Sequence, residues 1–203
     1  MKFVFCEGKD DLAVIQGVAV SIGLNDLNIE FFSGKDNLTH FLKAARLRPE
    51  FSRNQVSAVG IVRDADEDGQ AAFQSVRAAM LANGFNAPEK SGGVAAGEIL
   101  TGVMIIGPND GKGMIEDLCL KSVSNLPEFP CVEDYFRCVS QKRGRADFSA
   151  KAKVRAWLAT QSDHDLRVGK AAEAGYWPWQ SPAFEPLKVF LKKLANASEI
   201  KAV

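Results

Sequence analysis

The chain has 203 residues, of which 46% are hydrophobic and 25% charged, so its composition is that of a globular protein and excludes a disordered or fibrous chain. No apolar run is long enough to span a bilayer, and the first residues continue into charged ones rather than into the apolar core of a signal peptide. We therefore expect a cytoplasmic protein with no membrane partner.

The net charge is zero, but the charges are unevenly distributed along the chain. Residues 1–120 contain 11 basic and 16 acidic side chains, whereas residues 121–203 contain 14 basic and 9 acidic ones. The first part is therefore suited to holding a metal ion and the second part to holding phosphate. The alternative is that these charges only solvate the surface.

Strand-like and helix-like patterns alternate over the first 120 residues. Each of four short apolar runs is followed by a segment with apolar residues at helical spacing. This alternation predicts parallel βαβ units, hence an α/β fold in which helices sandwich a parallel sheet and ligands bind at the carboxyl ends of the strands. The predicted strands are 2–6, 28–32, 56–62 and 102–106, and the predicted helices are 10–23, 38–45, one from about residue 70 and one from 114.

The sequence beyond Leu126 is helical in pattern and rich in basic residues. A Pro-containing stretch at 126–130 marks a boundary. We therefore predict an α/β domain at 1–125 and a helical, basic subdomain at 126–203 that packs on it. The predicted helices of this second part are 132–140, 148–160, 166–174 and 186–195.

Three aspartates at alternate positions, Asp64, Asp66 and Asp68, directly follow the third predicted strand and are candidate metal ligands. Alternate residues of an extended segment point the same way, so the carboxylates of Asp64 and Asp66 can share one ion. Mg²⁺ prefers one or two carboxylates together with water, which leaves positions for phosphate oxygens. Two alternatives stay open: the carboxylates cap the next helix, or they belong to an EF-hand loop, whose twelfth position is Ser75 here instead of glutamate.

Two further acidic segments follow predicted strands. Glu7 stands at the end of the first strand, Gly8 permits a tight turn after it, and Asp11 can cap the following helix. Glu7 can face the paired aspartates across a neighbouring strand, and carboxylates this close repel one another unless a cation lies between them. Glu116 and Asp117, after the fourth strand, can complete a second metal site or can simply be acids favoured in a first helical turn.

A basic cluster lies in the C-terminal part of the chain. Such a cluster suits a phosphate backbone, and its lysines can also stabilise charge that develops on a scissile phosphate. A solvated helix face is the alternative. The nucleic-acid-binding candidates are Lys9, Lys142, Arg143, Arg145 and Arg155, and the catalytic candidates in this half are Lys151 and Lys153.

Taken together, Glu7-Gly8-x-x-Asp11 after the first strand and Asp64-x-Asp66 after the third resemble the Toprim domain of bacterial primases, type IA and type II topoisomerases, OLD-family nucleases and small maturases of ribosomal RNA. The resemblance covers more than half of the chain, and its pattern is most similar to that of the OLD-family nuclease branch. It implies that Glu7 acts as a general acid or base or as a metal ligand, and that Asp64 and Asp66 hold Mg²⁺ (or Mn²⁺).

The same resemblance implies roles for residues later in the chain. Glu116 and Asp117 look like the later acidic pair of the nuclease branch, and Lys151 or Lys153 is similar in placement to its downstream catalytic lysine. The chain departs from the topoisomerases because it lacks a candidate nucleophilic-tyrosine domain, so strand passage is not expected.

The leading hypothesis is a metal-dependent phosphodiesterase, a nuclease acting on DNA or RNA, in which Asp64 and Asp66 hold Mg²⁺ and Glu7 activates water or holds a second ion. A second hypothesis is a non-catalytic nucleic-acid-binding or partner-binding module that keeps the metal pocket. A third is a receiver-like phospho-acceptor domain, although the chain offers Glu7-Gly8 where that fold wants an acidic pair. The expected partners are nucleic acid and either a second copy of the chain or another protein.

Overall fold

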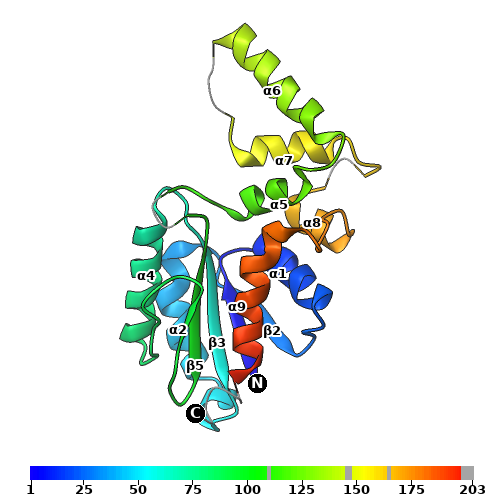
Figure 1. Cartoon of the computed structure of the whole chain (residues 1–203). Helices are drawn as coiled ribbons and strands as arrows, with labels where there is room; N and C mark the ends of the chain where they lie inside the picture. Colours follow the sequence, from blue (N-terminus) through cyan, green and yellow to red (C-terminus); the bar gives the residue numbers. More distant parts are fainter. Residues whose placement is uncertain (109–110, 145–147, 164–165, 198–203) are drawn as a thin grey trace.

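The computed structural model describes residues 1–108, 111–144, 148–163 and 166–197. Over these residues the chain forms a five-stranded sheet in the order β2-β1-β3-β5-β4, with helices on both faces (Figure 1). All neighbouring strands are parallel except β4, which runs antiparallel to β5. The predicted α/β fold, with a mostly parallel sheet between helices, is confirmed. The strands are β1 (Lys2–Cys6), β2 (Leu27–Phe31), β3 (Ala58–Asp64), β4 (Gly93–Ala95) and β5 (Leu100–Ile106).

The helices divide into two layers. On one face α2 and α4 pack over the side chains of one hydrophobic cluster, and on the other face α1, α5, α8 and α9 enclose a second, larger cluster (Figure 1). None of the helices in the described part of the chain has the length and apolar character needed to cross a membrane. The helices are α1 (Lys9–Ser21), α2 (Leu38–Arg46), α3 (Pro49–Ser52), α4 (Gly69–Ala82), α5 (Ile115–Val123), α6 (Phe129–Arg143), α7 (Ala150–Leu158), α8 (Val168–Glu173) and α9 (Glu185–Ala195), with 3₁₀ turns η1 (Lys35–Asn37) and η2 (Pro182–Phe184).

The helices after residue 126 differ in how they relate to the sheet. The last helix, α9, packs directly on β3 and β5, and α8 packs on α1. In contrast, α7 lies across the carboxyl edge of the sheet, where it packs on α5, and α6 projects beyond it (Figure 1). The predicted division of the chain at residue 125 stays a prediction, but α9 supplies buried core side chains to the sheet and is part of the same hydrophobic cluster as β1 and α1.

Glycines in the two central strands allow α9 to lie close to the sheet. A Cβ atom added at Gly60 would lie 2.2 Å from Leu194 Cδ1, and one at Gly102 would lie 2.8 Å from Phe190 Cε2. Both helix residues are fully buried. The absence of side chains at these positions therefore sets the distance between α9 and the sheet.

Replacing Gly60 with alanine is expected to lower the free energy of unfolding by about 1–3 kcal/mol, because the added methyl group overpacks the contact with Leu194. Urea unfolding of Gly60→Ala, Leu194→Ala and the double variant measures this effect. The double variant should lose less stability than the two single variants together, because the shorter side chain relieves the clash. Strict additivity would contradict this account of the contact.

The strand order creates a switch point at the middle of the sheet. The chain leaves β1 towards β2 on one side and later returns to β3 on the other side. Connections on opposite sides open a crevice at the carboxyl ends of the two strands, which is where open α/β sheets bind their ligands. Glu7 directly follows β1 and Asp64 is the last residue of β3, so both lie at this switch point.

Candidate functional site

The turn after β1 places two carboxylates at the switch point. Gly8 is the N-cap of α1 in extended conformation, and its backbone N–H donates a hydrogen bond of 2.7 Å to Asp11 Oδ2. This contact is the capping interaction expected for Asp11. The same side chain also faces the cavity described next, so its function is not limited to capping.

An open cavity of about 720 Å³ lies at the carboxyl edge of the sheet, between the ends of β1 and β3 and the starts of α1, α5 and α8. We call it the acidic pocket. Its wall carries carboxylates from four separate parts of the chain and is rimmed by cations. The acidic residues are Glu7, Asp10, Asp11, Asp64, Glu116 and Glu173, and the basic ones are Lys9, Lys151, Arg167 and Lys170.

Burial and mutual repulsion make the carboxylates of the acidic pocket hard to ionise together. Burial, and then the charges of Asp11 and Glu116, raise the pKa of Asp64 from 3.8 to about 9. Burial is also the main reason why the pKa of Asp11 rises to about 7. The pKa values of Glu7 and Glu116 are raised as well, again chiefly by burial. The pocket therefore favours protonated carboxyl groups or a bound cation.

A buried arginine lies behind this cluster. The side chain of Arg63 is 8% exposed, and its guanidinium lies 3.7 Å from Glu7 Oε2 and 4.0 Å from Asp66 Oδ2. One of its terminal nitrogens donates a 3.2 Å hydrogen bond to Ser75 Oγ. Glu7 Oε2 is therefore in ion-pair range of Arg63, but this oxygen is buried and has no hydrogen-bond partner. Arg63 was not among the predicted site residues, although a lone charge at the end of an apolar strand was a signal for it.

Asp66 does not point the same way as Asp64, so the prediction from extended geometry is wrong. Asp66 has a left-handed backbone, with φ of 53°, and exchanges two backbone hydrogen bonds with Gly113. Its carboxylate lies 4.0 Å from the ammonium of Lys35 and is 40% exposed. It lines a neighbouring hollow with Glu7 and the η1 turn, while Asp64 lines the acidic pocket. Glu7 lines both.

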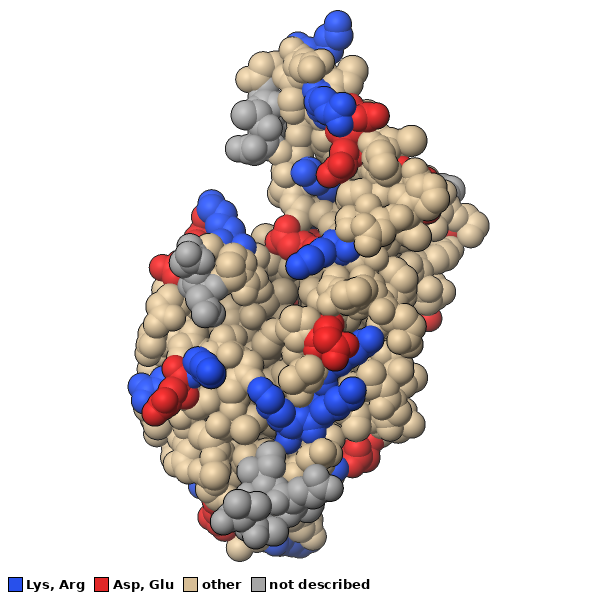
Figure 2. Space-filling view, in the orientation of Figure 1, with Lys and Arg blue, Asp and Glu red and all other residues tan. Residues whose placement is uncertain are grey.

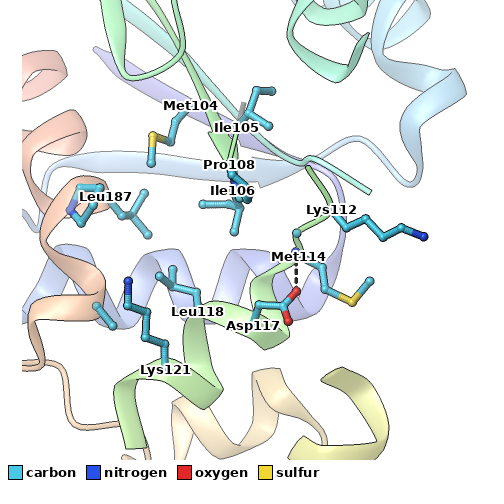
Figure 3. Close-up of a pocket in the computed structure, with 14 residues that line it drawn as sticks. Met104, Ile105, Ile106, Pro108, Lys112, Met114, Asp117, Leu118, Lys121 and Leu187 are labelled. Atoms are coloured by element: carbon cyan, nitrogen blue, oxygen red, sulfur yellow. Dashed lines mark hydrogen bonds between the residues drawn. The ribbon is translucent and has the colours of Figure 1, made fainter. Parts of the chain in front are cut away.

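Two other predicted metal ligands cap helices. Asp68 accepts a hydrogen bond of 3.0 Å from the backbone N–H of Ala71 at the start of α4. Asp117 accepts one of 3.0 Å from the backbone N–H of Met114 at the start of α5 (Figure 3). Neither side chain lines the acidic pocket. Asp117 instead borders a separate cavity of about 380 Å³ with mostly apolar walls. Of the predicted pair Glu116 and Asp117, therefore, only Glu116 lines the acidic pocket.

The two candidate catalytic lysines are placed differently. Lys151, on α7, reaches into the acidic pocket, where its ammonium lies 3.8 Å from Glu116 Oε1. Lys153 is partly exposed on the same helix and does not line the pocket. Two residues along a helix turn a side chain by about 200°, which explains the difference.

The predicted nucleic-acid-binding residues are dispersed. Lys142 and Arg143 form the C-terminal end of α6, and this end lies at the tip of the molecule (Figure 1). Arg145 lies outside the described residues. Lys9 is at the rim of the acidic pocket, with its ammonium 5.8 Å from the ring centre of Phe31. Figure 2 shows acidic and basic side chains interspersed over one face rather than one continuous basic field.

The negative charge of the acidic pocket suits a divalent cation, but the spacing of its carboxylates is less well suited to one. In the part of the chain that the structure describes, no group of three or more His, Cys, Asp or Glu side chains is arranged to hold a metal ion. Mg²⁺ needs only one or two carboxylates, because water fills its other positions. Asp11 and Asp64 are both half-buried, and the charge of Asp11 helps to raise the pKa of Asp64, so this pair meets that requirement. Glu7 Oε2 adds a buried oxygen with no hydrogen-bond partner.

Comparisons with known proteins place the chain in a family. A family model described as "Protein of unknown function (DUF3226)" matches residues 1–196, which is nearly the whole chain. The chain belongs to the DUF3226 family. A crystal structure of hypothetical protein PH0156 from Pyrococcus horikoshii OT3 is similar to this DUF3226 chain, with a TM-score of 0.62 and 15% identity over 99% of this chain and 98% of that one. At that identity the likeness shows the fold alone. No curated protein matches this DUF3226 member.

Proposed function

We propose that the chain is a Mg²⁺- or Mn²⁺-dependent phosphodiesterase, a nuclease that acts on DNA or RNA. The observation that carries this proposal is the acidic pocket at the β1/β3 switch point, where Glu7, Asp11, Asp64 and Glu116 face one cavity that is rimmed by cations. The resemblance of the segments around Glu7 and Asp64 to Toprim domains supports it. We also propose a cytoplasmic location, nucleic acid as the partner, and assembly with a second copy or another protein.

Each residue of the pocket has a distinct task in this proposal. Asp11 and Asp64 hold the cation, which when bound polarises a phosphate oxygen and lowers the pKa of a water molecule. Glu7 accepts the proton of the attacking water, and its raised pKa brings it closer to the range in which general bases are effective. Arg63 keeps the Glu7 carboxylate in place from behind, at 3.7 Å. Lys151 balances the negative charge that develops on the phosphate.

A nicking assay on supercoiled plasmid, together with cleavage of labelled single-stranded DNA and RNA, tests the proposal. We expect cleavage with Mg²⁺ or Mn²⁺, none with EDTA, and a loss of about 10²–10⁴-fold in Glu7→Gln, because its proton acceptor is removed. Glu133→Gln is the matched control, because Glu133 is exposed on α6. Equal activity in Glu7→Gln and Glu133→Gln would remove Glu7 from the mechanism.

The second candidate is a binding module that keeps the pocket and does not cleave. The position of Asp66, paired with Lys35 and Arg63 rather than with Asp64, favours it, because one half of the predicted metal pair is occupied by protein cations. This candidate requires nucleic-acid binding that weakens as salt increases and no cleavage with any divalent ion. The nicking assay therefore decides between the two.

A further inference from the structure

A smaller cavity, of about 230 Å³, adjoins the acidic pocket between α7 and α8. We call it the α7–α8 cavity. Four residues line both spaces, so the two form one continuous depression: Asp10, Glu116, Lys151 and Arg167. A ligand that enters the acidic pocket can therefore extend into the α7–α8 cavity.

The walls of the α7–α8 cavity combine cations with an apolar floor. Lys151 and Arg155 are four residues apart on α7 and lie on one face of that helix. Arg167 comes from the start of α8, on the opposite wall. The floor between them consists of the buried side chains of Val154, Leu158 and Val168. Arg155 and Arg167 are exposed, so a ligand can reach both guanidinium groups.

The docking of α8 on α1 fixes the position of Arg167. The backbone N–H of Gly169 donates a 3.1 Å hydrogen bond to Asp10 Oδ1. A Cβ atom at position 169 would lie 2.9 Å from the Cα of Asp10, so only glycine allows this approach. Arg167 is thereby held beside the acidic pocket although 156 residues separate it in sequence from Asp11.

The carboxylates of the α7–α8 cavity already have partners. Glu116 pairs with Lys151 at 3.8 Å, and Asp10 accepts the hydrogen bond from Gly169. Within the described part of the chain, neither Arg155 nor Arg167 has a carboxylate in ion-pair range. Two guanidinium groups on facing walls therefore remain available. A guanidinium presents a planar set of donors that matches phosphate oxygens.

We propose that Arg155 and Arg167 form a phosphate subsite that holds the strand phosphate next to the one bound at the acidic pocket. The inference rests on the proposed function in one respect, namely that a nucleic-acid strand crosses the acidic pocket. It adds a direction: the strand leaves the acidic pocket between α7 and α8. It also assigns a binding role to Arg167, which the spacing of the basic cluster does not reveal.

Fluorescence anisotropy with a fluorescein-labelled single-stranded DNA oligonucleotide, in EDTA over a series of KCl concentrations, tests the subsite without cleavage. For Arg155→Gln/Arg167→Gln we expect about tenfold weaker binding and a salt slope smaller by roughly 0.7–1.4, because one or two phosphate contacts are lost. The control variant is Lys43→Gln/Lys192→Gln, which also removes two positive charges, but from exposed positions on α2 and α9. Its slope should match that of the wild type.

The outcomes separate this inference from the proposed function. If the arginine variant has a smaller salt slope and the wild type does not cleave, the subsite is supported and the nuclease proposal is overturned. If the wild type cleaves and the arginine and lysine variants have equal salt slopes, the nuclease proposal is supported and the subsite is overturned. Should the double arginine variant not fold, Arg155→Gln and Arg167→Gln are measured singly, and each is expected to show about half of the slope change.

Discussion

Replacing Asp64 with asparagine is expected to stabilise the metal-free protein, by about 4 kcal/mol in the free energy of unfolding at pH 7 and by more at higher pH. Burial, Asp11 and Glu116 raise the pKa of Asp64 to about 9, so at pH 8 the folded chain must either hold a proton there or keep a charge in an unfavourable place. Asparagine has nearly the same shape and carries no charge. A residue at the centre of the proposed site thus lowers the stability of the fold.

The pH dependence of this effect has a definite sign. The folded pKa of Asp64, about 9, is higher than its ordinary value of 3.8. The folded state therefore binds the proton more tightly than the unfolded state does, and the stability that Asp64 contributes is complete below about pH 4 and is lost as pH rises towards 9. The difference in stability between Asp64→Asn and the wild type should grow over the same interval.

Thermal unfolding in EDTA between pH 5 and pH 9 measures this difference. We expect the melting temperature of Asp64→Asn to exceed that of the wild type by about 10 °C or more at the alkaline end. Asp26→Asn is the control of opposite sign, because Asp26 is exposed and its hydrogen bond with Lys2 lowers its pKa. An Asp64→Asn variant that is less stable than the wild type at pH 8 would contradict the assigned electrostatics.

Adding Mg²⁺ to the same experiment tests the metal site. A ligand that binds only the folded state raises the melting temperature of the wild type. Asp64→Asn lacks a carboxylate and should show no such rise. A similar shift in both proteins would place the cation elsewhere.

The sequence predicted the fold and part of the site for a simple geometric reason. Apolar runs of strand length alternate with helical periodicity, and parallel strands bring their carboxyl ends to one edge. Glu7 and Asp64 therefore come together at the switch point although 57 positions separate them. Asp11 was predicted correctly as a cap, but its second environment, the wall of the acidic pocket, depends on the arrangement of β3 and α5 around α1.

Other features depend on long-range contacts that leave no local pattern. The left-handed conformation of Asp66 follows from its pairing with Gly113, and no residue near Asp66 indicates it. The position of Arg167 depends on how α8 packs on α1 through Gly169. The antiparallel strand β4 has three residues, which is too short for an alternating pattern. In each case the deciding partner lies far away in the sequence.

Lys151 and Lys153 provide the sharpest test of the proposed chemistry, because they are the same residue type on one helix and only one of them reaches the acidic pocket. We expect Lys151→Met to lose about 10²–10³-fold in kcat/KM for cleavage, because a charge that stabilises the scissile phosphate is removed. Lys153→Met should lose less than about threefold, in keeping with the loss of one peripheral charge.

Stability measurements separate this catalytic effect from damage to the fold. The Lys151 side chain is 63% exposed and its ion pair with Glu116 spans 3.8 Å, so its removal should change the free energy of unfolding by less than about 1 kcal/mol. Glu116, whose pKa is already raised by burial, can take up a proton when the lysine is absent. Equal activity losses in Lys151→Met and Lys153→Met would mean that α7 contributes only general positive charge, and a larger loss in Lys153→Met would place the phosphate on the other side of the helix.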